Sequence, residues 1–170
     1  MPEFKFGLFT SFILFVWMVM VYTIIVPNYH EAGNFVMFVS ILIPVIGIYL
    51  GIKERKEKNN FGYITYKEAF KTGIVITFII AVMIVLFTYV YYEYINPDYV
   101  NFLAAKSEQT MIEKNIPRDQ IDTALTILRY QFSLNVQIIQ QMLFVLIGGI
   151  VITFILSFLQ KKEKRIKPAG

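Results

Sequence analysis

The sequence has no cysteine and only one histidine, His30, and these absences remove several classes of site. Without cysteine there can be no disulfide, thiolate zinc site, iron–sulfur cluster or cysteine nucleophile. A zinc ion needs three or four protein ligands, which His30 and its neighbour Glu31 cannot supply, so we interpret this pair as part of a solvated loop. We therefore predict no catalytic, cofactor-binding or metal-binding residue, no cofactor and no enzymatic activity.

Charge is scarce as well, because Asp, Glu, Lys and Arg make up 16% of the chain, against about 25% in soluble domains. These residue types are absent from the stretches 6–30, 32–52, 72–92 and 130–160. A transmembrane helix needs roughly 20 mostly apolar residues, and each stretch is long enough. The sequence therefore predicts an all-α fold, a four-span transmembrane helical bundle that forms a single integral membrane domain over residues 1–170. The predicted spans are 6–26, 34–52, 72–92 and 136–159.

Local signals refine the first three spans. Pro27 ends the first helix, because the residue before a proline disfavours the helical region. Pro44 removes one backbone hydrogen bond from the second helix and predicts a kink there. Thr65 and Glu68 match a capping box, in which each side chain binds the backbone amide of the other residue. The third helix is therefore predicted to run from 66 to 94.

Four tyrosines crowd the far end of this third helix. Amphipathic aromatic rings favour the headgroup layer of a membrane. We therefore predict an aromatic belt made of Tyr89, Tyr91, Tyr92 and Tyr94.

Lysine and arginine are distributed unequally among the segments that flank the spans. The first loop, 27–33, has none and the second, 53–71, has six, whereas the third, 93–132, has four and the basic tail, 160–170, has five. Segments rich in Lys and Arg stay in the cytoplasm. We therefore predict a multi-pass protein of the inner (cytoplasmic) membrane, with both termini cytoplasmic and the third loop exterior. This topology accounts for the net charge of +4 without a nucleic-acid partner.

Two basic runs, 53–58 and 161–167, flank the predicted second and fourth spans. We interpret them as anchors that fix the topology. The alternative is that they attract anionic lipid.

The third loop is too long for a simple connection and has helical patterns of its own. Residues 98–114 contain no Gly or Pro and are predicted to form one helix. Pro117 suits the first position of a second helix, which carries an apolar stripe at helical spacing. The stripe consists of Ile121, Ala124, Leu125, Leu128 and Phe132.

No Gly or Pro follows Pro117 until Gly148, so we predict one continuous helix over 117–161. At 1.5 Å per residue this helix would be roughly 67 Å long, more than twice the thickness of the hydrocarbon core. Its first half must then project outward, with the helix 98–114 folded against it. The prediction is an exterior helical insertion at 97–133, a hairpin whose apolar stripe either packs only on its partner helix or helps to bind an external protein.

Polar and small residues in the spans predict close contacts between helices. Three glutamines at the outer end of the fourth span share one helix face by their spacing. They are Gln137, Gln140 and Gln141, and Gly148 continues this face. Two patterns of small residues four apart are Gly47 with Gly51 and Ala69 with Gly73. We interpret both features as packing within the chain, with a polar vestibule and a dimer contact as the respective alternatives.

Three segments resemble a known family. They are GIK at 51–53, GYITYKEAFKTG at 62–73 and YYEYINPD at 91–98. Together with the four-span layout, they resemble the membrane family known as domain of unknown function 4199, over residues 6–159. The resemblance implies a bacterial four-helix membrane protein, and it implies no activity and no site residue.

Two classes of function remain open. Ionisable residues inside a membrane span usually mark an ion or proton path, and the four apolar stretches contain no Asp, Glu, Lys or Arg. We therefore expect an integral membrane protein of unknown biochemical activity that acts as a non-catalytic accessory or interaction protein. Its expected partners are the lipid bilayer and a membrane or exterior protein. The alternative is a small transporter or channel subunit, and the sequence sets no oligomeric state.

Overall fold

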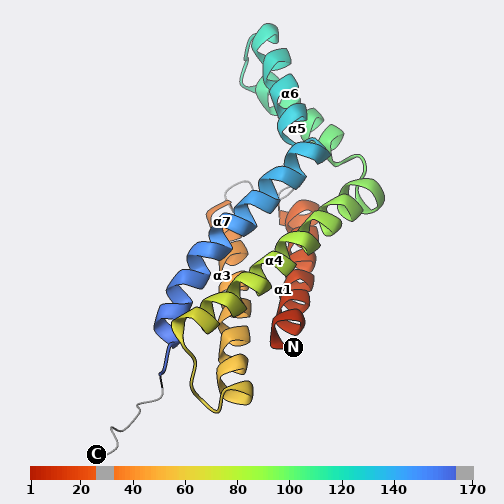
Figure 1. The fold of residues 1–170 in the computed structure, drawn as a ribbon. Coiled ribbons are helices and arrows are strands. Elements are labelled where there is room, and N and C mark those ends of the chain that lie inside the picture. Colours follow the sequence, from red (N-terminus) through yellow and green to blue (C-terminus); the bar gives the residue numbers. More distant parts are fainter. Residues whose placement is uncertain (26–32, 164–170) are drawn as a thin grey trace, which may run out of the picture. The chain divides into compact units, whose positions relative to one another are not determined.

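The computed structural model describes residues 1–25 and 33–163 (Figure 1). Within this part, the chain is helical apart from its turns and a pair of backbone hydrogen bonds between Ile64 and Lys162. Outside the described residues lie the predicted helix end at Pro27, the pair His30 and Glu31, and the tail from residue 164 onward. The chain forms two compact units, Met1–Ile84 with Leu143–Gly170 and Val85–Met142, and each is described by itself.

Four helices in the described part of the chain are long and apolar enough to cross a membrane. Each of the first three combines an α-helix with a π-helical turn at its end: α1 (Pro2–Met20) with η1 (Val21–Ile25), α3 (Gly33–Glu54) with η2 (Arg55–Asn59), and α4 (Tyr66–Val90) with η3 (Tyr91–Ile95). The fourth is α7 (Leu134–Gln160). The predicted all-helical architecture is confirmed, and so are four helices long and apolar enough to span a membrane.

The helices extend beyond the apolar stretches that predicted them. α1 begins at Pro2 rather than at residue 6, and the helix of the second span continues to Asn59, into the predicted second loop. Because Glu, Lys and Arg are good helix formers, charge indicates where a span leaves the membrane but not where its helix ends. α3 also runs through Pro44 without ending, and the kink at this residue stays a prediction.

The beginning of α4 confirms the capping box. The Thr65 backbone amide donates to Glu68 Oε2 at 3.0 Å, and the Glu68 amide donates to Thr65 Oγ1 at 3.3 Å. Together with η3 this span ends at Ile95, one residue beyond the prediction. At the α-helical rise its 30 residues extend about 45 Å, which exceeds the hydrocarbon core.

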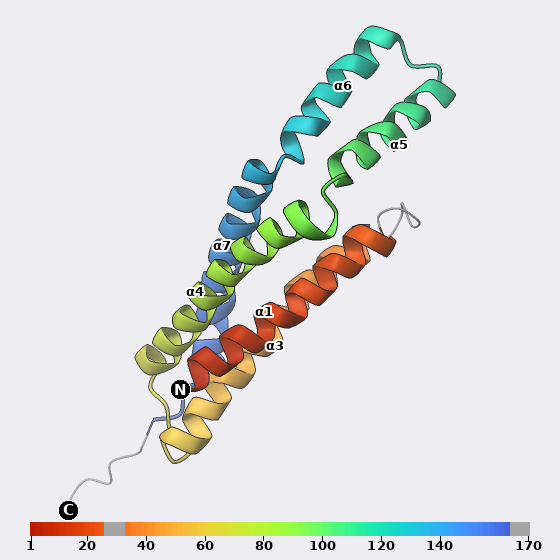
Figure 2. The same cartoon turned by 90° about the vertical axis from the view of Figure 1, so that its right-hand side faces the viewer.

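In the first unit, α1 and α3 lie side by side, as the short predicted loop between them requires (Figures 1 and 2). Trp17 of α1 donates its indole N–H to Ser40 Oγ of α3 at 3.0 Å, and its ring meets Phe35 edge-on at 6.1 Å. Isoleucines of α3 and α4 fill the core of this unit. The most buried of them are Ile48, Ile52, Ile76 and Ile80.

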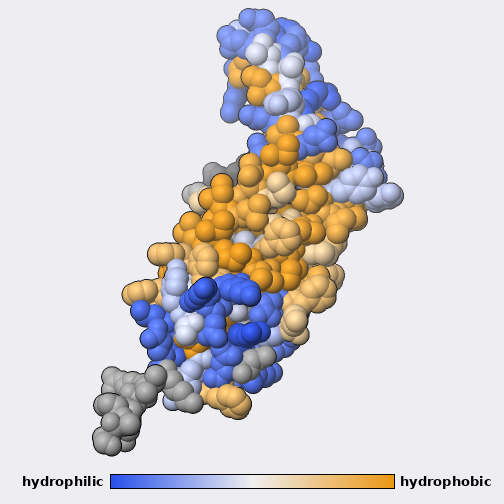
Figure 3. Space-filling model, in the orientation of Figure 1, coloured by the Kyte–Doolittle hydropathy of each residue, from blue (hydrophilic) through white to orange (hydrophobic). Residues whose placement is uncertain are grey.

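The spans leave most of their apolar surface exposed. In the most apolar 18-residue stretch of α7, only 17% is buried. Phe154 and Phe158 on this helix are about three-fifths exposed. Figure 3 shows hydrophobic side chains covering the surface over α7 and α4. Water does not tolerate so large a contiguous apolar surface, whereas lipid tails do. These are the properties of a multi-pass integral membrane protein.

The second unit contains two further helices, α5 (Tyr99–Glu113) and α6 (Arg118–Gln131), which pack against each other. They occupy the predicted insertion at 97–133, and α5 confirms the helix predicted over 98–114. Figure 2 shows α5 and α6 running antiparallel as a hairpin.

The turn between α5 and α6 ends the first helix with a left-handed residue, Asn115, whose φ is 55°. The Ile116 amide donates to the Met111 carbonyl at 3.1 Å, which is the Schellman arrangement for closing a helix. Pro117 then precedes α6 as its N-cap. The prediction that Pro117 is the first residue of the helix is therefore wrong by one position.

The predicted continuous helix over 117–161 is wrong, because α6 ends at Gln131 and α7 begins at Leu134. Two side chains donate to backbone carbonyls at this break. Ser133 Oγ donates to the Tyr130 carbonyl at 2.7 Å, and Gln137 Nε2 donates to the Gln131 carbonyl at 3.0 Å. Polar side chains can compete with the backbone for carbonyls in this way, so the helix is interrupted without glycine or proline.

Candidate functional site: the α4–α7 contact and the α5–α6 hairpin

In the first unit, α4 and α7 approach closely through a reciprocal contact between glycine and threonine. Gly73 of α4 faces Thr153 of α7, and Gly149 of α7 faces Thr77 of α4. All four residues are buried, and the two threonine hydroxyl oxygens lie 3.5 Å apart. Each glycine leaves room for the threonine of the opposite helix, so the two backbones can pack tightly.

An internal repeat underlies this contact, and the predictions from sequence missed it. The heptapeptide GIVITFI occurs at 73–79 and again at 149–155. Because α4 and α7 are antiparallel, the glycine of each copy meets the threonine four residues further along the other copy. A search for identical segments would have found the repeat, but only the fold shows that its two copies face each other.

The two predicted patterns of small residues pack within the chain. Gly47 lies against Thr10 of α1, and Gly51 lies against Ile76 of α4. Ala69 is fully buried on α4, one turn before Gly73. These contacts confirm the packing role predicted for both patterns and connect α1, α3 and α4 in the first unit.

The predicted glutamine face is correct for two of its three members. Gln137 is buried and Gln141 is half-buried, whereas Gln140 is exposed. Thr88 donates its hydroxyl to Gln141 Oε1 at 3.5 Å, a contact between α4 and α7 within the second unit. Gly148 does not extend this face into a close contact, because a Cβ added there would meet nothing within 4 Å. The adjacent Gly149 makes the close contact instead, because it faces Thr77 of α4.

The second unit contains an aromatic cluster of three buried tyrosines and one half-buried phenylalanine: Tyr91, Tyr92, Tyr99 and Phe132. The rings of the three tyrosines meet edge to face, with centroids 5.8 to 6.0 Å apart. Phe132, at the break between α6 and α7, lies 6.5 Å from Tyr99. Asn96 donates from its side-chain amide to the Tyr91 hydroxyl at 3.1 Å. The aromatic cluster therefore connects η3 with both ends of the hairpin.

The predicted aromatic belt is wrong for two of its four tyrosines. Tyr89 and Tyr94 are exposed, but Tyr91 and Tyr92 are buried. The two buried residues follow Thr88 by three and four positions, so they continue the buried stripe of α4 at helical spacing. The belt was predicted from the number of tyrosines, whereas their periodicity separates the inward pair from the outward pair.

The apolar stripe of α6 lies on the inner side of the hairpin. Ile121 is 2% exposed, and the other four members of the stripe are partly buried. Arg118 forms an ion pair with Glu108 at 2.7 Å, and Arg129 donates to Asn101 Oδ1 at 2.7 Å. Packing and polar contacts thus join α5 to α6, while several apolar side chains of the hairpin point outward. The exposed ones are Phe102, Ile112, Ile127 and Tyr130.

The polar groups between the helices of both units stabilise the packing of one helix against another. The buried hydroxyls and amides described above bind one another or backbone carbonyls. Among residues 1–25 and 33–163, no group of three or more His, Cys, Asp or Glu side chains could hold a metal ion.

Comparison with known proteins confirms the resemblance seen in the sequence. A family model described as protein of unknown function (DUF4199) matches residues 5–162. No curated protein and no solved structure matches the chain. The matched region includes the α5–α6 hairpin and nearly the whole length of the four membrane-spanning helices. Because the match covers most of the sequence, the chain belongs to the DUF4199 family of proteins of unknown function.

Proposed function

We propose that this protein is a non-catalytic accessory or interaction protein of the membrane, and that the α5–α6 hairpin binds its protein partner. The observation that carries the proposal is the contrast between the spans and the hairpin. The apolar stretches of the spans contain no Asp, Glu, Lys or Arg, whereas ion and proton paths normally use such residues. Their buried polar groups are hydroxyls and amides, which suit packing between helices.

The outer face of the hairpin supports the second half of the proposal. Tyr130 is 70% exposed and Ile127, one turn earlier on α6, is 51% exposed. Tyrosine is enriched at the centre of protein interfaces, where an apolar ring and a polar hydroxyl can both be used. The internal ion pair and the apolar stripe already hold the hairpin together, so these outward side chains are available to a partner.

We further propose that the hairpin lies outside the cell and that both termini are cytoplasmic, in the inner membrane of a bacterium. The second loop and the C-terminal tail, which lie on the side of the predicted topology opposite the hairpin, carry more Lys and Arg than the hairpin side, and this excess supports the orientation. The chain has no cysteine, so single cysteines can report sidedness directly. Lys114→Cys, beyond α5, should react with a membrane-impermeant maleimide in intact cells, whereas Phe61→Cys should react only after permeabilisation. The opposite pattern would contradict the orientation.

Binding by the hairpin can be tested with a photo-crosslinking amino acid placed at single positions in cells. We expect one defined protein adduct from position 130 and none from position 61, although Phe61 is 90% exposed. Adding Ile127→Asp should reduce the adduct from position 130 several-fold, because a charge then replaces a contact residue. The hairpin would be excluded as the binding element if positions 130 and 61 gave equal adduct yields. It would also be excluded if Ile127→Asp left the yield from position 130 unchanged.

A flux assay separates this proposal from a transporter or channel subunit. Purified protein reconstituted in vesicles should give no solute-specific flux above that of empty vesicles. Specific flux that a single substitution in a span abolishes, with the protein still folded, would overturn the proposed accessory function.

A further inference from the structure

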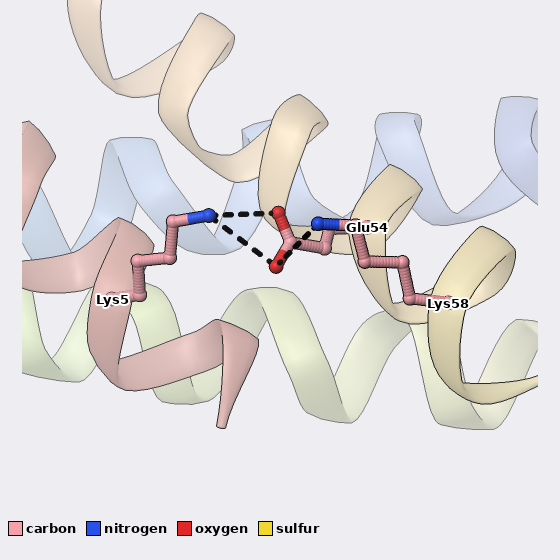
Figure 4. A network of polar contacts seen from close by, with 3 residues as sticks. All are labelled: Lys5, Glu54 and Lys58. Atoms are coloured by element: carbon pink, nitrogen blue, oxygen red, sulfur yellow. Dashed lines mark hydrogen bonds and ion pairs between the residues drawn. The ribbon is translucent and has the colours of Figure 1, made fainter.

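Some basic side chains near the ends of α1 and α3 are neutralised within the chain. Glu54 receives hydrogen bonds from Lys5 at 3.0 and 3.4 Å and forms an ion pair with Lys58 at 3.6 Å (Figure 4). Arg55 forms an ion pair with Glu3 at 3.1 Å. These cations therefore have carboxylate partners of their own, and part of the basic run 53–58 is a structural contact between helices.

Other lysines of the first unit have no such partner. Lys67 and Lys71 on α4 and Lys161 after α7 are exposed, and no ion pair joins them to a carboxylate in the described part of the chain. We call these three residues the boundary lysines. Lys161 Nζ lies 4.6 Å from the centre of the Phe158 ring, a cation–π distance.

The boundary lysines continue the lipid-facing stripes of their helices. Lys67 and Lys71 are followed at helical spacing by Val75 and Phe78, which are 38% and 60% exposed. Lys161 follows Phe158, which is itself 60% exposed. Each ammonium group therefore stands where an apolar helix face meets the polar end of the span. Lysines in this position extend toward the headgroup layer.

The two helices bring the boundary lysines to the same end of one helix pair. Gly73 faces Thr153 across the contact, and the backbones of Ile64 and Lys162 form two hydrogen bonds, at 3.0 and 2.9 Å. This register places the beginning of α4 beside the end of α7. All three boundary lysines therefore lie at one end of this helix pair.

We propose that Lys67, Lys71 and Lys161 bind the phosphates of anionic phospholipids that surround this end of the α4–α7 helix pair. The acyl chains lie along the exposed apolar side chains next to the lysines, which follow them on α4 and precede Lys161 on α7, and the ammonium groups contact the phosphates. A lipid fits better than a soluble anion, because the charges adjoin an apolar surface. Anionic lipid fits better than a zwitterionic one, because no carboxylate within residues 1–25 and 33–163 pairs with the boundary lysines.

The test uses the full-length protein in phosphatidylcholine vesicles that contain a minor fraction of spin-labelled phosphatidylglycerol. The motionally restricted spin fraction gives the preference of the protein for the anionic lipid. Lys67→Gln/Lys71→Gln should lower this preference several-fold, since each near-surface lysine is worth up to about fivefold in affinity for anionic lipid. Lys5→Gln/Lys58→Gln removes the same charge from ion-paired positions and should lower the preference by less than half as much.

Three results would overturn the proposal. The first is no preference for phosphatidylglycerol in the unsubstituted protein, and the second is an equal loss in both double variants, which would mean general electrostatic attraction. The third is displacement of the labelled lipid by inorganic phosphate at constant ionic strength, which would indicate a soluble anion as the ligand. Lys67→Arg/Lys71→Arg should keep the preference, and this rescue separates loss of charge from loss of fold.

Discussion

Gly149→Ala is expected to destabilise the protein by about 1–3 kcal/mol, the usual cost of adding a methyl group to a well-packed core. The added Cβ would overlap the Thr77 side chain, and even the Cβ of Thr77 would be only 3.1 Å away. Threonine is branched at Cβ and stiff about χ1, so it cannot move aside freely. The backbones of α4 and α7 must separate instead, which weakens the reciprocal contact.

Gly148→Ala is the matched control, because it makes the same change at the adjacent residue of the same helix. Nothing lies within 4 Å of the added Cβ, and alanine is a better helix former than glycine by about 1 kcal/mol. We therefore expect a neutral or stabilising effect. The difference in stability is measured by unfolding both purified variants in the same detergent, with the loss of helicity as the signal. Adding Thr77→Ala to Gly149→Ala should recover part of the lost stability. Equal unfolding midpoints for Gly148→Ala and Gly149→Ala would contradict the reciprocal contact.

The sequence predicts those parts of the fold that depend on local chemistry. The spans follow from stretches without charge, the beginning of α4 follows from Thr65 and Glu68, and α5 follows from a run without glycine or proline. The inner side of α6 follows from the spacing of its apolar residues. In each case the determining residues lie within a few turns of one another, so no knowledge of the rest of the chain is needed.

The predictions that fail depend on contacts that the local pattern does not contain. The break at Ser133 requires side chains to bind the carbonyls of Tyr130 and Gln131, and serine within a helical pattern does not by itself predict this. The choice of Gly149 over Gly148 is made by Thr77 of another helix. The candidate interaction site depends on the same kind of information, because it is the pairing of α5 with α6 that leaves Ile127 and Tyr130 exposed.

Tyr99→Ala is expected to have the largest effect on the second unit. Tyr99 is 1% exposed, and its ring contacts those of Tyr91, Tyr92 and Phe132. Replacing a buried aromatic residue by alanine costs about 3–5 kcal/mol, which includes the cavity that is left. The loss falls on the residues that connect η3 with the hairpin, so α5 and α6 should open more readily while the core of the first unit stays protected.

Hydrogen exchange of the backbone amides, measured in lipid nanodiscs, can localise this effect. Amides of α5 and α6 should exchange much faster in Tyr99→Ala than in the unsubstituted protein, and those of α1 and α3 should not change. Tyr94→Ala is the control, because Tyr94 is 73% exposed and its ring contacts only the exposed Tyr89 among the aromatic pairs of the described residues. Tyr99→Phe keeps the ring and removes the hydroxyl, so a small effect of this variant would assign the loss to ring packing. If exchange in Tyr99→Ala rises equally in all helices, the hairpin does not open as a unit of its own, and its role as a separate binding element loses its physical basis.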